Sequence, residues 1–231
     1  LIASDSPDPA PEQDGRTGRS GPEEHALGTS AAALSSTESG GLFPSRLGPL
    51  SYPQLPAWLP SLSAQTCNAC HGAIHDQWAS SGHSKAASNP VYRAAVSALD
   101  EPDLCEECHQ PLLAQRSLLR MGPGAGGTEE VANPRWEPLL AGEGVTCVVC
   151  HLRDDQIVGP RPIQKGQAPH PVVAHEEMRG PEACSFCHQL SLPGNEEHPY
   201  IDTLGEWADS PHAEAGIVCQ DCHMPKESGV I

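Results

Sequence analysis

Ten cysteines lie in five copies of one pattern, C-x-x-C-H, which is the strongest chemical signal in the sequence. The cysteine pairs are Cys67 and Cys70, Cys105 and Cys108, Cys147 and Cys150, Cys184 and Cys187, and Cys219 and Cys222. The histidines that follow them are His71, His109, His151, His188 and His223. Two thiols at this spacing can form thioethers with the two vinyl groups on one edge of a porphyrin, and the adjacent histidine can then bind its iron. The pattern predicts five covalently bound c-type haems (Fe), each with a proximal histidine.

Zinc binding, disulfide bonding and thiol redox chemistry fit this pattern of cysteines less well. Paired C-x-x-C motifs can bind zinc, but a zinc site does not require a histidine directly after each second cysteine. A disulfide framework would use ten cysteines, but it would not repeat one spacing five times. A thioredoxin-like motif would occur once, beside a βαβ pattern, and the sequence has no such pattern.

The composition offers little material for a core made of protein alone. The 231 residues include 24 Pro and 22 Gly, but only 4 Trp, 3 Tyr and 2 Phe. Apolar area removed from water stabilises a fold by about 25 cal/mol per Å², and here we expect porphyrins to supply much of that area. We therefore expect a mostly irregular chain with short α-helices wrapped around a stack of five haems, with little or no β-sheet. The chain without haem should not fold stably.

The secondary structure expected between the motifs is local. Residues 75–87 and 91–99 have helical patterns, whereas the Gly-rich residues 122–127 and the Pro-rich residues 159–171 should form loops.

Net charge and hydropathy limit the partners of the chain. Its 13 Lys+Arg against 30 Asp+Glu give a formal charge of −17, which disfavours nucleic acid as a partner. There is no apolar run of 18 residues, so we expect no membrane span in this chain. The sequence starts at Leu1 and shows no signal peptide, so we interpret it as processed. Covalent haem attachment takes place outside the bacterial cytoplasm, which predicts an extracellular or cell-surface protein, or alternatively a periplasmic one.

Two regions follow from the change in composition along the chain. Residues 1–66 form an extended arm rich in Pro, Gly and Ser, and residues 67–231 form the pentahaem domain. Within the arm, residues 42–62 alternate apolar side chains with prolines, so this stretch can lie extended in a groove but cannot form a long helix. We expect the arm to dock on a neighbouring subunit.

Seven histidines lie outside the motifs and are candidates for the second, distal iron ligand. We predict this role for His83, His170, His175, His198 and His212. His75 lies one helical turn after His71 and could point to a different haem, while His25 in the arm could reach a haem of another subunit. Met121 and Met178 are expected to be packing residues, and Met224 is too close to its own motif to reach that iron.

The chain resembles the multihaem cytochromes c of nitrification and extracellular electron transfer. The resemblance covers roughly residues 65–226 and is carried by residues 78–83 (a W-x-x-S-x-H-like element), 144–146, 187–189, 206–211 and 222–225. It implies closely packed haems with two histidine ligands each, and it makes His83 the best supported distal ligand. Some members of this group are soluble carriers, some are enzymes, and some polymerise into filaments.

Electron transfer through closely spaced haems is therefore the first functional expectation, and catalysis is not expected. The chain would be a subunit of a head-to-tail extracellular filament or nanowire, or it would meet other redox proteins. The alternatives are a periplasmic carrier, a subunit of a respiratory complex, and a multihaem reductase with one open haem site.

Overall fold

The computed structural model describes residues 42–43, 48–99, 103–121, 129–164, 166–192, 194–195 and 197–224. The chain divides into two units, Leu1–Ala31 and Ala32–Ile231, and every described residue belongs to the second unit. The predicted loop at 122–127, the first 41 residues of the predicted arm and His25 lie outside the described residues.

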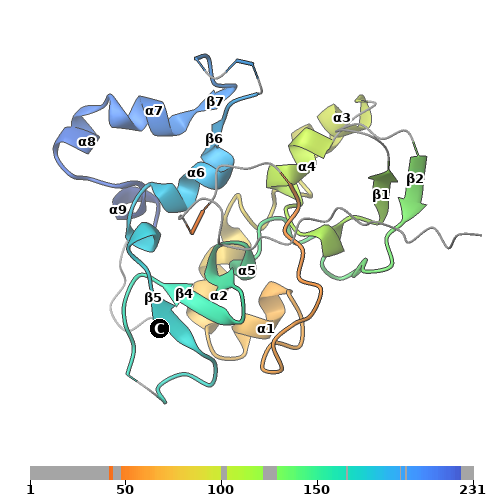
Figure 1. The fold of residues 1–231 in the computed structure, drawn as a ribbon, viewed down its shortest axis with the longest axis horizontal. Coiled ribbons are helices and arrows are strands. Elements are labelled where there is room, and N and C mark those ends of the chain that lie inside the picture. The colour runs from red at the N-terminus through yellow and green to blue at the C-terminus, as the bar shows by residue number, and fades with distance from the viewer. Residues whose placement is uncertain are drawn as a thin grey trace, which may run out of the picture. The chain divides into compact units, whose positions relative to one another are not determined.

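The described residues form nine short α-helices, two 3-10 helices and seven strands (Figure 1). The α-helices are α1 (Ala64–Asn68), α2 (Gly72–Ser80), α3 (Pro90–Ser97), α4 (Asp103–His109), α5 (Cys147–His151), α6 (Glu182–His188), α7 (Thr203–Ala208), α8 (Pro211–Glu214) and α9 (Cys219–His223). The 3-10 helices are η1 (Leu113–Gln115) and η2 (Glu176–Arg179). The strands are β1 (Leu118–Met121), β2 (Glu129–Ala132), β3 (Leu152–Arg153), β4 (Gln156–Gly159), β5 (Val172–Ala174), β6 (Gln189–Leu190) and β7 (Ile201–Asp202).

Local signals explain where the helices begin and end. The side chain of Ser63 caps α1, and that of Asn89 caps α3, which has Pro90 at its first turn. The helix predicted at residues 91–99 is therefore present, and it spans Pro90–Ser97. The helix predicted at 75–87 ends at Ser80, and residues 81–88 form turns instead.

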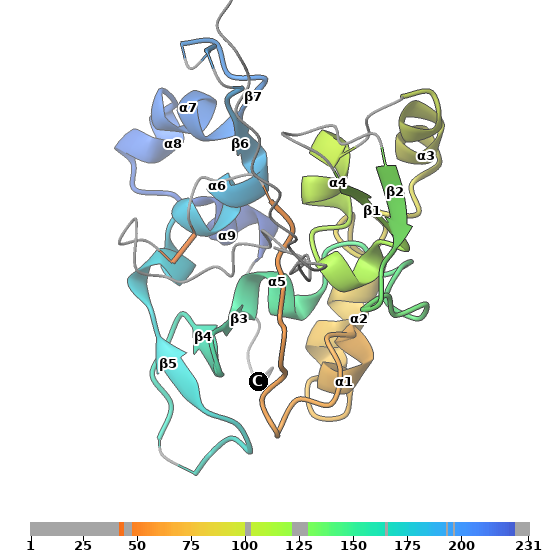
Figure 2. The same cartoon turned by 45° about the vertical axis from the view of Figure 1, so that its right-hand side comes forward.

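The strands form three small sheets, so the prediction of little or no β-sheet is wrong and the fold is mixed α/β. Strands β1 and β2 pair antiparallel, β4 pairs antiparallel with β3 and parallel with β5, and β6 pairs antiparallel with β7. Figure 2 shows the β1–β2 pair beside α4. Each strand has only two to four residues, which is too short for a period-two pattern in the sequence. The predicted loop at 159–171 connects β4 to β5.

The main core joins the Pro-rich stretch before the first motif to the segments around the second and third motifs. The buried residues of this core are Leu50, Leu59, Leu62, Leu112, Ala114, Leu140, Val145, Val148, Val149 and Leu152. The Leu50 backbone pairs with the segment that follows the second motif. Its N–H donates to Pro111 O at 2.7 Å, and its carbonyl accepts from Leu113 N at 2.8 Å. The Tyr52 hydroxyl donates to Leu152 O at 3.0 Å. This part of the predicted arm therefore packs on its own chain, while docking of the arm on a neighbouring subunit stays a prediction.

A smaller apolar cluster lies around β4 and η2. Phe43, Val158 and Met178 are buried together there, and the Arg153 guanidinium lies over the Phe43 ring at 4.7 Å. Met178 thus has the packing role that the sequence suggested. No helix among the described residues is both long and apolar enough to cross a membrane.

The Gln115 side chain bonds to three backbone groups inside the main core and joins its own segment to residues 140–144. Gln115 is 2% exposed, and its Oε1 accepts from Leu112 N at 2.9 Å. Its Nε2 donates to Gly144 O at 2.6 Å and lies 3.4 Å from Leu140 O. A buried amide with these partners satisfies backbone groups that water cannot reach.

Replacing Gln115 by alanine should lower the free energy of unfolding by about 3 kcal/mol, because the change leaves buried backbone groups without partners and opens a small cavity. Guanidinium unfolding followed by circular dichroism measures the loss. The matched control is Gln77→Ala, because Gln77 is exposed and its change should cost less than about 0.5 kcal/mol. Equal losses in the two variants would contradict the role given to Gln115.

Candidate functional site

Each C-x-x-C-H motif forms a helical turn. Helices α4, α5, α6 and α9 end at the histidine of their motifs. In the first motif, the Cys67 carbonyl accepts from Cys70 N at 3.2 Å and from His71 N at 2.9 Å. Residues three and four positions apart lie on the same side of a helical turn. The turn therefore brings two thiols and one imidazole to one side of the backbone, as attachment of a porphyrin requires.

Backbone carbonyls fix the orientation of two proximal imidazoles. His109 Nδ1 lies 2.9 Å from Ala86 O, and His151 Nδ1 lies 2.8 Å from Val158 O. A carbonyl only accepts, so Nδ1 must carry the proton and Nε2 keeps its lone pair. This is the arrangement that metal-binding histidines use, because the bond at one nitrogen fixes the tautomer and the direction of the other.

Two proximal histidines each face a second histidine from a distant part of the chain. The ring centroids of His71 and His170 are 6.4 Å apart, with an angle of 42° between the ring planes. The ring centroids of His83 and His188 are 6.2 Å apart, with an angle of 64°. The two pairs join residues that are 99 and 105 positions apart in the sequence.

These separations fit an iron between the two rings. A metal–imidazole nitrogen bond of about 2.0 Å, with about 1.1 Å from that nitrogen to the ring centre, places two opposed centroids about 6.2 Å apart. Parallel stacking gives a shorter separation, such as the 4.0 Å between the centroids of Tyr92 and His109, whereas tilted or edge-to-face rings in direct contact also lie about 4.5–7 Å apart. The residues at the first and fourth motifs therefore fit a haem with two histidine ligands.

The surroundings of these histidines favour the neutral, ligand form. Desolvation and the neighbouring His188 lower the pKa of His83, and desolvation and His223 lower the pKa of His188, although both residues are exposed. Burial lowers the pKa of His151. Nδ1 of His71 and Nδ1 of His170 are buried without a hydrogen-bond partner among the described residues. A metal binds unprotonated imidazole, so lowered pKa values support ligation at neutral pH.

The other spare histidines in the described residues face no proximal histidine. His75 is buried, and its Nε2 lies 3.0 Å from the side-chain amide nitrogen of Gln65. His175 Nδ1 accepts from Glu177 N at 3.3 Å, which caps η2. His198 and His212 are exposed. The structure thus pairs His83 and His170 with proximal histidines, while distal roles for the remaining candidates stay predictions.

Thiols from different motifs lie close enough to shift each other's pKa. The pairs are Cys67 with Cys147, Cys108 with Cys187, and Cys184 with Cys219. The neighbouring Cys147 thiol lowers the pKa of Cys67 to about 7, and burial together with Cys219 raises the pKa of Cys184 to about 12. All ten cysteines are free in the structure. These pairs bring the first motif beside the third, the second beside the fourth, and the fourth beside the fifth.

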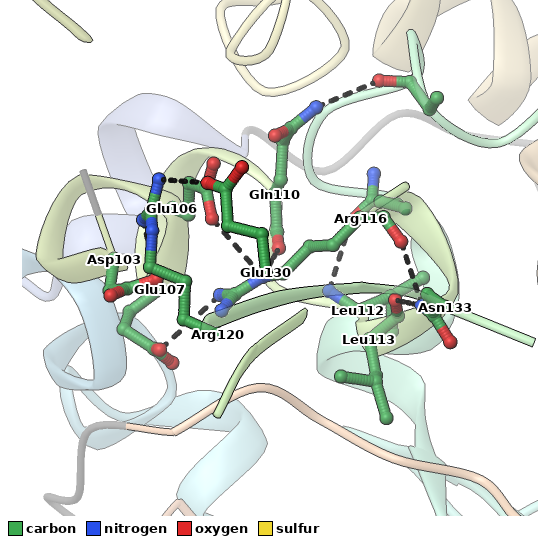
Figure 3. Close-up of polar contacts among 12 residues, drawn as sticks. Asp103, Glu106, Glu107, Gln110, Leu112, Leu113, Arg116, Arg120, Glu130 and Asn133 are labelled. Carbon is green, nitrogen blue, oxygen red and sulfur yellow. Dashed lines mark hydrogen bonds and ion pairs between the residues drawn. The ribbon is translucent and has the colours of Figure 1, made fainter. Parts of the chain in front are cut away.

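Two arginines hold the helix of the second motif, as Figure 3 shows. The Arg116 side chain is 8% exposed and lies 3.8 Å from Glu106 and 3.3 Å from Glu107, the two residues between the cysteines of the motif. Arg120 pairs with Asp103 at 3.0 Å and with Glu130 at 3.2 Å, which ties α4 to β1 and β2. Desolvation raises the pKa of Glu107 despite Arg116, so this carboxylate is costly to bury.

Sequence reasoning missed several groups that position the imidazoles. The Trp58 ring lies 5.3 Å from the His170 ring, and the carbonyls of Ala86 and Val158 accept from proximal histidines. A backbone carbonyl is present in every residue, so the sequence does not show which carbonyl will accept a hydrogen bond from a histidine. A tryptophan within a run of prolines could have been recognised as a possible partner of a histidine, but its target could not.

A backbone frame places His83 opposite His188. The His83 carbonyl accepts from Val145 N at 2.9 Å, and Trp78 Nε1 donates to the Val145 carbonyl at 2.7 Å. Gly144, directly before Val145, has φ +62°, and a Cβ there would collide with the His83 carbonyl. Glycine is therefore required at this position for both its conformation and its close approach.

The variant Gly144→Ala should be more destabilising than Gly216→Ala. Gly216 also has a positive φ, +69°, but a Cβ there would meet nothing within 4 Å. Both changes carry a left-handed backbone cost of about 1–2 kcal/mol, and only the first adds a collision that displaces His83. Unfolding free energies of the two variants test this difference. Equal losses would mean that the Gly144–His83 contact does not matter.

Comparison of the chain with protein-family models, with curated proteins and with solved structures found no match. Among the described residues, no group of three or more His, Cys, Asp or Glu side chains lies together in a way that could hold a metal ion. A haem needs only one or two protein ligands for its iron, so this finding does not bear on haem binding. The chemistry of the site is therefore inferred from the residues of this chain alone.

Proposed function

We propose that this chain binds five c-type haems covalently and transfers electrons between them. The observation that supports this most directly is the opposition of His71 to His170 and of His83 to His188 at the separation that an intervening iron requires. Thiol pairs at the spacing of haem attachment lie beside His71 and His188 in the same helical turns.

The chain's own residues would have three roles at each site. The two cysteines of a motif would hold the porphyrin by thioether bonds, and the histidine would bind the iron through Nε2. The carbonyls of Ala86 and Val158 would keep the proton on Nδ1 of His109 and His151. At the first and fourth motifs, His170 and His83 would be second protein ligands of the iron and would leave no site on it for a substrate. When bound, each haem would supply an iron that accepts and releases one electron.

The proximity of the motifs supports transfer within the chain. The Cys67 thiol lies near Cys147, and the Cys184 thiol lies near Cys219, so porphyrins attached to these thiols would lie close together. The partner of the chain would be another redox protein or a second copy of the same chain in a filament. Covalent haem attachment places the protein at the cell surface, outside the cell or in the periplasm.

A multihaem reductase is the second candidate, and the second motif is the place that favours it. Among the described residues, His109 faces no second histidine, and the Tyr92 ring stacks on it at 4.0 Å. The Tyr92 hydroxyl is buried and has no hydrogen-bond partner among the described residues. Desolvation, and to a lesser extent the charge of Glu106, raise the pKa of this hydroxyl to about 12. An open iron beside a proton donor is what reductive catalysis requires.

Electron paramagnetic resonance on the oxidised protein tests the first candidate. The irons held by His71 with His170 and by His188 with His83 should be low-spin. His83→Ala or His170→Ala should each convert one iron to the high-spin form, because a weak ligand or none replaces an imidazole. Gln77→Ala is the control, because Gln77 is exposed and its side chain is no candidate iron ligand, so its loss should leave the spin states unchanged.

Two outcomes of this experiment would count against electron transfer as proposed. If the His83 and His170 variants kept the spectrum of the unaltered protein, the facing pairs would not be iron ligands. If nitrite or cyanide changed the spectrum of the unaltered protein, an open iron would be present and the reductase would become the better supported candidate.

A further inference from the structure

A cavity of about 330 Å³ lies between the Pro-rich stretch before the first motif and the segment after β2. It is lined by residues 50–53, Leu55 and Leu62 of the Pro-rich stretch, and by residues 113–114 and 134–137. None of the described residues that line it is a cysteine or a histidine, so the proposed haem sites make no use of it. Its volume is at the small end of the range of about 300–1,000 Å³ for pockets that bind small molecules, which suits a ligand of one or two rings.

Most of the side chains that line the cavity are apolar or aromatic. Leu50, Leu62 and Ala114 belong to the buried core and form part of the lining. Tyr52 and Trp136 contribute aromatic rings, and Trp136 remains 44% exposed. Aromatic side chains stack on flat rings, and tryptophan is enriched where proteins bind partners. The lining therefore favours a ligand with a flat, apolar ring.

A cation without a carboxylate partner stands beside this apolar lining. The Arg135 guanidinium donates to the Ser51 hydroxyl at 3.0 Å, and among the described residues it forms no ion pair. Glu137 also lines the cavity, but its carboxylate accepts from the Ser61 hydroxyl at 3.3 Å. A guanidinium carries five N–H donors in a planar fork that matches a carboxylate, so most of the donors of Arg135 remain available for a ligand.

We propose that this cavity binds a small molecule that carries one flat aromatic ring system and one carboxylate. The ring would lie against Tyr52 and Trp136, and the carboxylate would accept hydrogen bonds from the Arg135 guanidinium. The net charge of −17 repels anions at longer range, so a single negative charge fits this site better than a nucleotide or another polyanion. Binding would change no covalent bond and would not involve the haems.

A ligand in the cavity would join two parts of the chain. Ser51 and Tyr52 belong to the Pro-rich stretch before the first motif, whereas Arg135 and Trp136 follow β2. Across this boundary the Arg135–Ser51 hydrogen bond is partly exposed, and the ligand would add contacts to both walls. A molecule that binds the folded chain and not the unfolded one raises the melting temperature, so binding should stabilise the protein.

Equilibrium dialysis of the full-length protein against naphthoate tests this site, and naphthamide is the matched probe that keeps the ring but loses the charge. Physiological salt screens the long-range repulsion, so naphthoate should bind about fivefold more tightly than naphthamide, as one solvent-accessible ion pair allows. Arg135→Gln should remove this difference between the probes. Trp136→Ala should weaken both probes by about tenfold, and Trp136→Phe should restore most of the loss because it keeps an aromatic ring.

Arg161→Gln and Leu139→Ala are the matched controls, because both residues are exposed and neither lines the cavity. They should leave both dissociation constants unchanged, and naphthoate should raise the melting temperature of the controls and of the unaltered protein alike. No saturable binding, the same affinity for the two probes, or equal binding by Trp136→Ala and the unaltered protein would overturn the proposal. Thermal unfolding without probe shows that each variant is folded, so a loss of binding cannot be a loss of structure.

Discussion

Two pairs of facing imidazoles, His71 with His170 and His83 with His188, impose the main constraint on this fold. The partners of each pair come from segments about one hundred residues apart, so the chain must fix two distant loops relative to each other. It does so with backbone frames and with a core in which the stretch before the first motif packs against the third motif. Loop closure over such distances costs conformational entropy, which only a cooperative core or a bound group can offset.

The order of the motifs in space differs from their order in the sequence. Thiol pairs bring the first motif beside the third and the second beside the fourth. The loops that connect successive motifs carry both of the spare histidines that face a motif histidine. His83 lies between the first two motifs but faces the fourth, and His170 lies between the third and fourth but faces the first.

Residue types predict the attachment chemistry, whereas the positions of these residues in space do not follow from residue types. The spacing of Cys and His predicts the five turns, and the turns are present because a helix brings residues three and four positions apart together. His75 and His83 are both plausible ligands in the sequence, but only packing decides that one contacts Gln65 and the other faces His188. The sheets were missed because strands of two to four residues arise from pairing between distant segments rather than from local pattern. The acceptors of the Nδ1 protons are backbone carbonyls, which every residue has.

Intact mass of the protein, produced in a host that attaches haem to C-x-x-C-H motifs, tests the central claim most directly. The account predicts the polypeptide mass plus five haems, with no thiol left to react with an alkylating reagent. Three pairs of thiols from different motifs lie close together, so a disulfide-bonded protein is the specific alternative. A mass without haem, lowered by two hydrogens for each disulfide, would contradict the account.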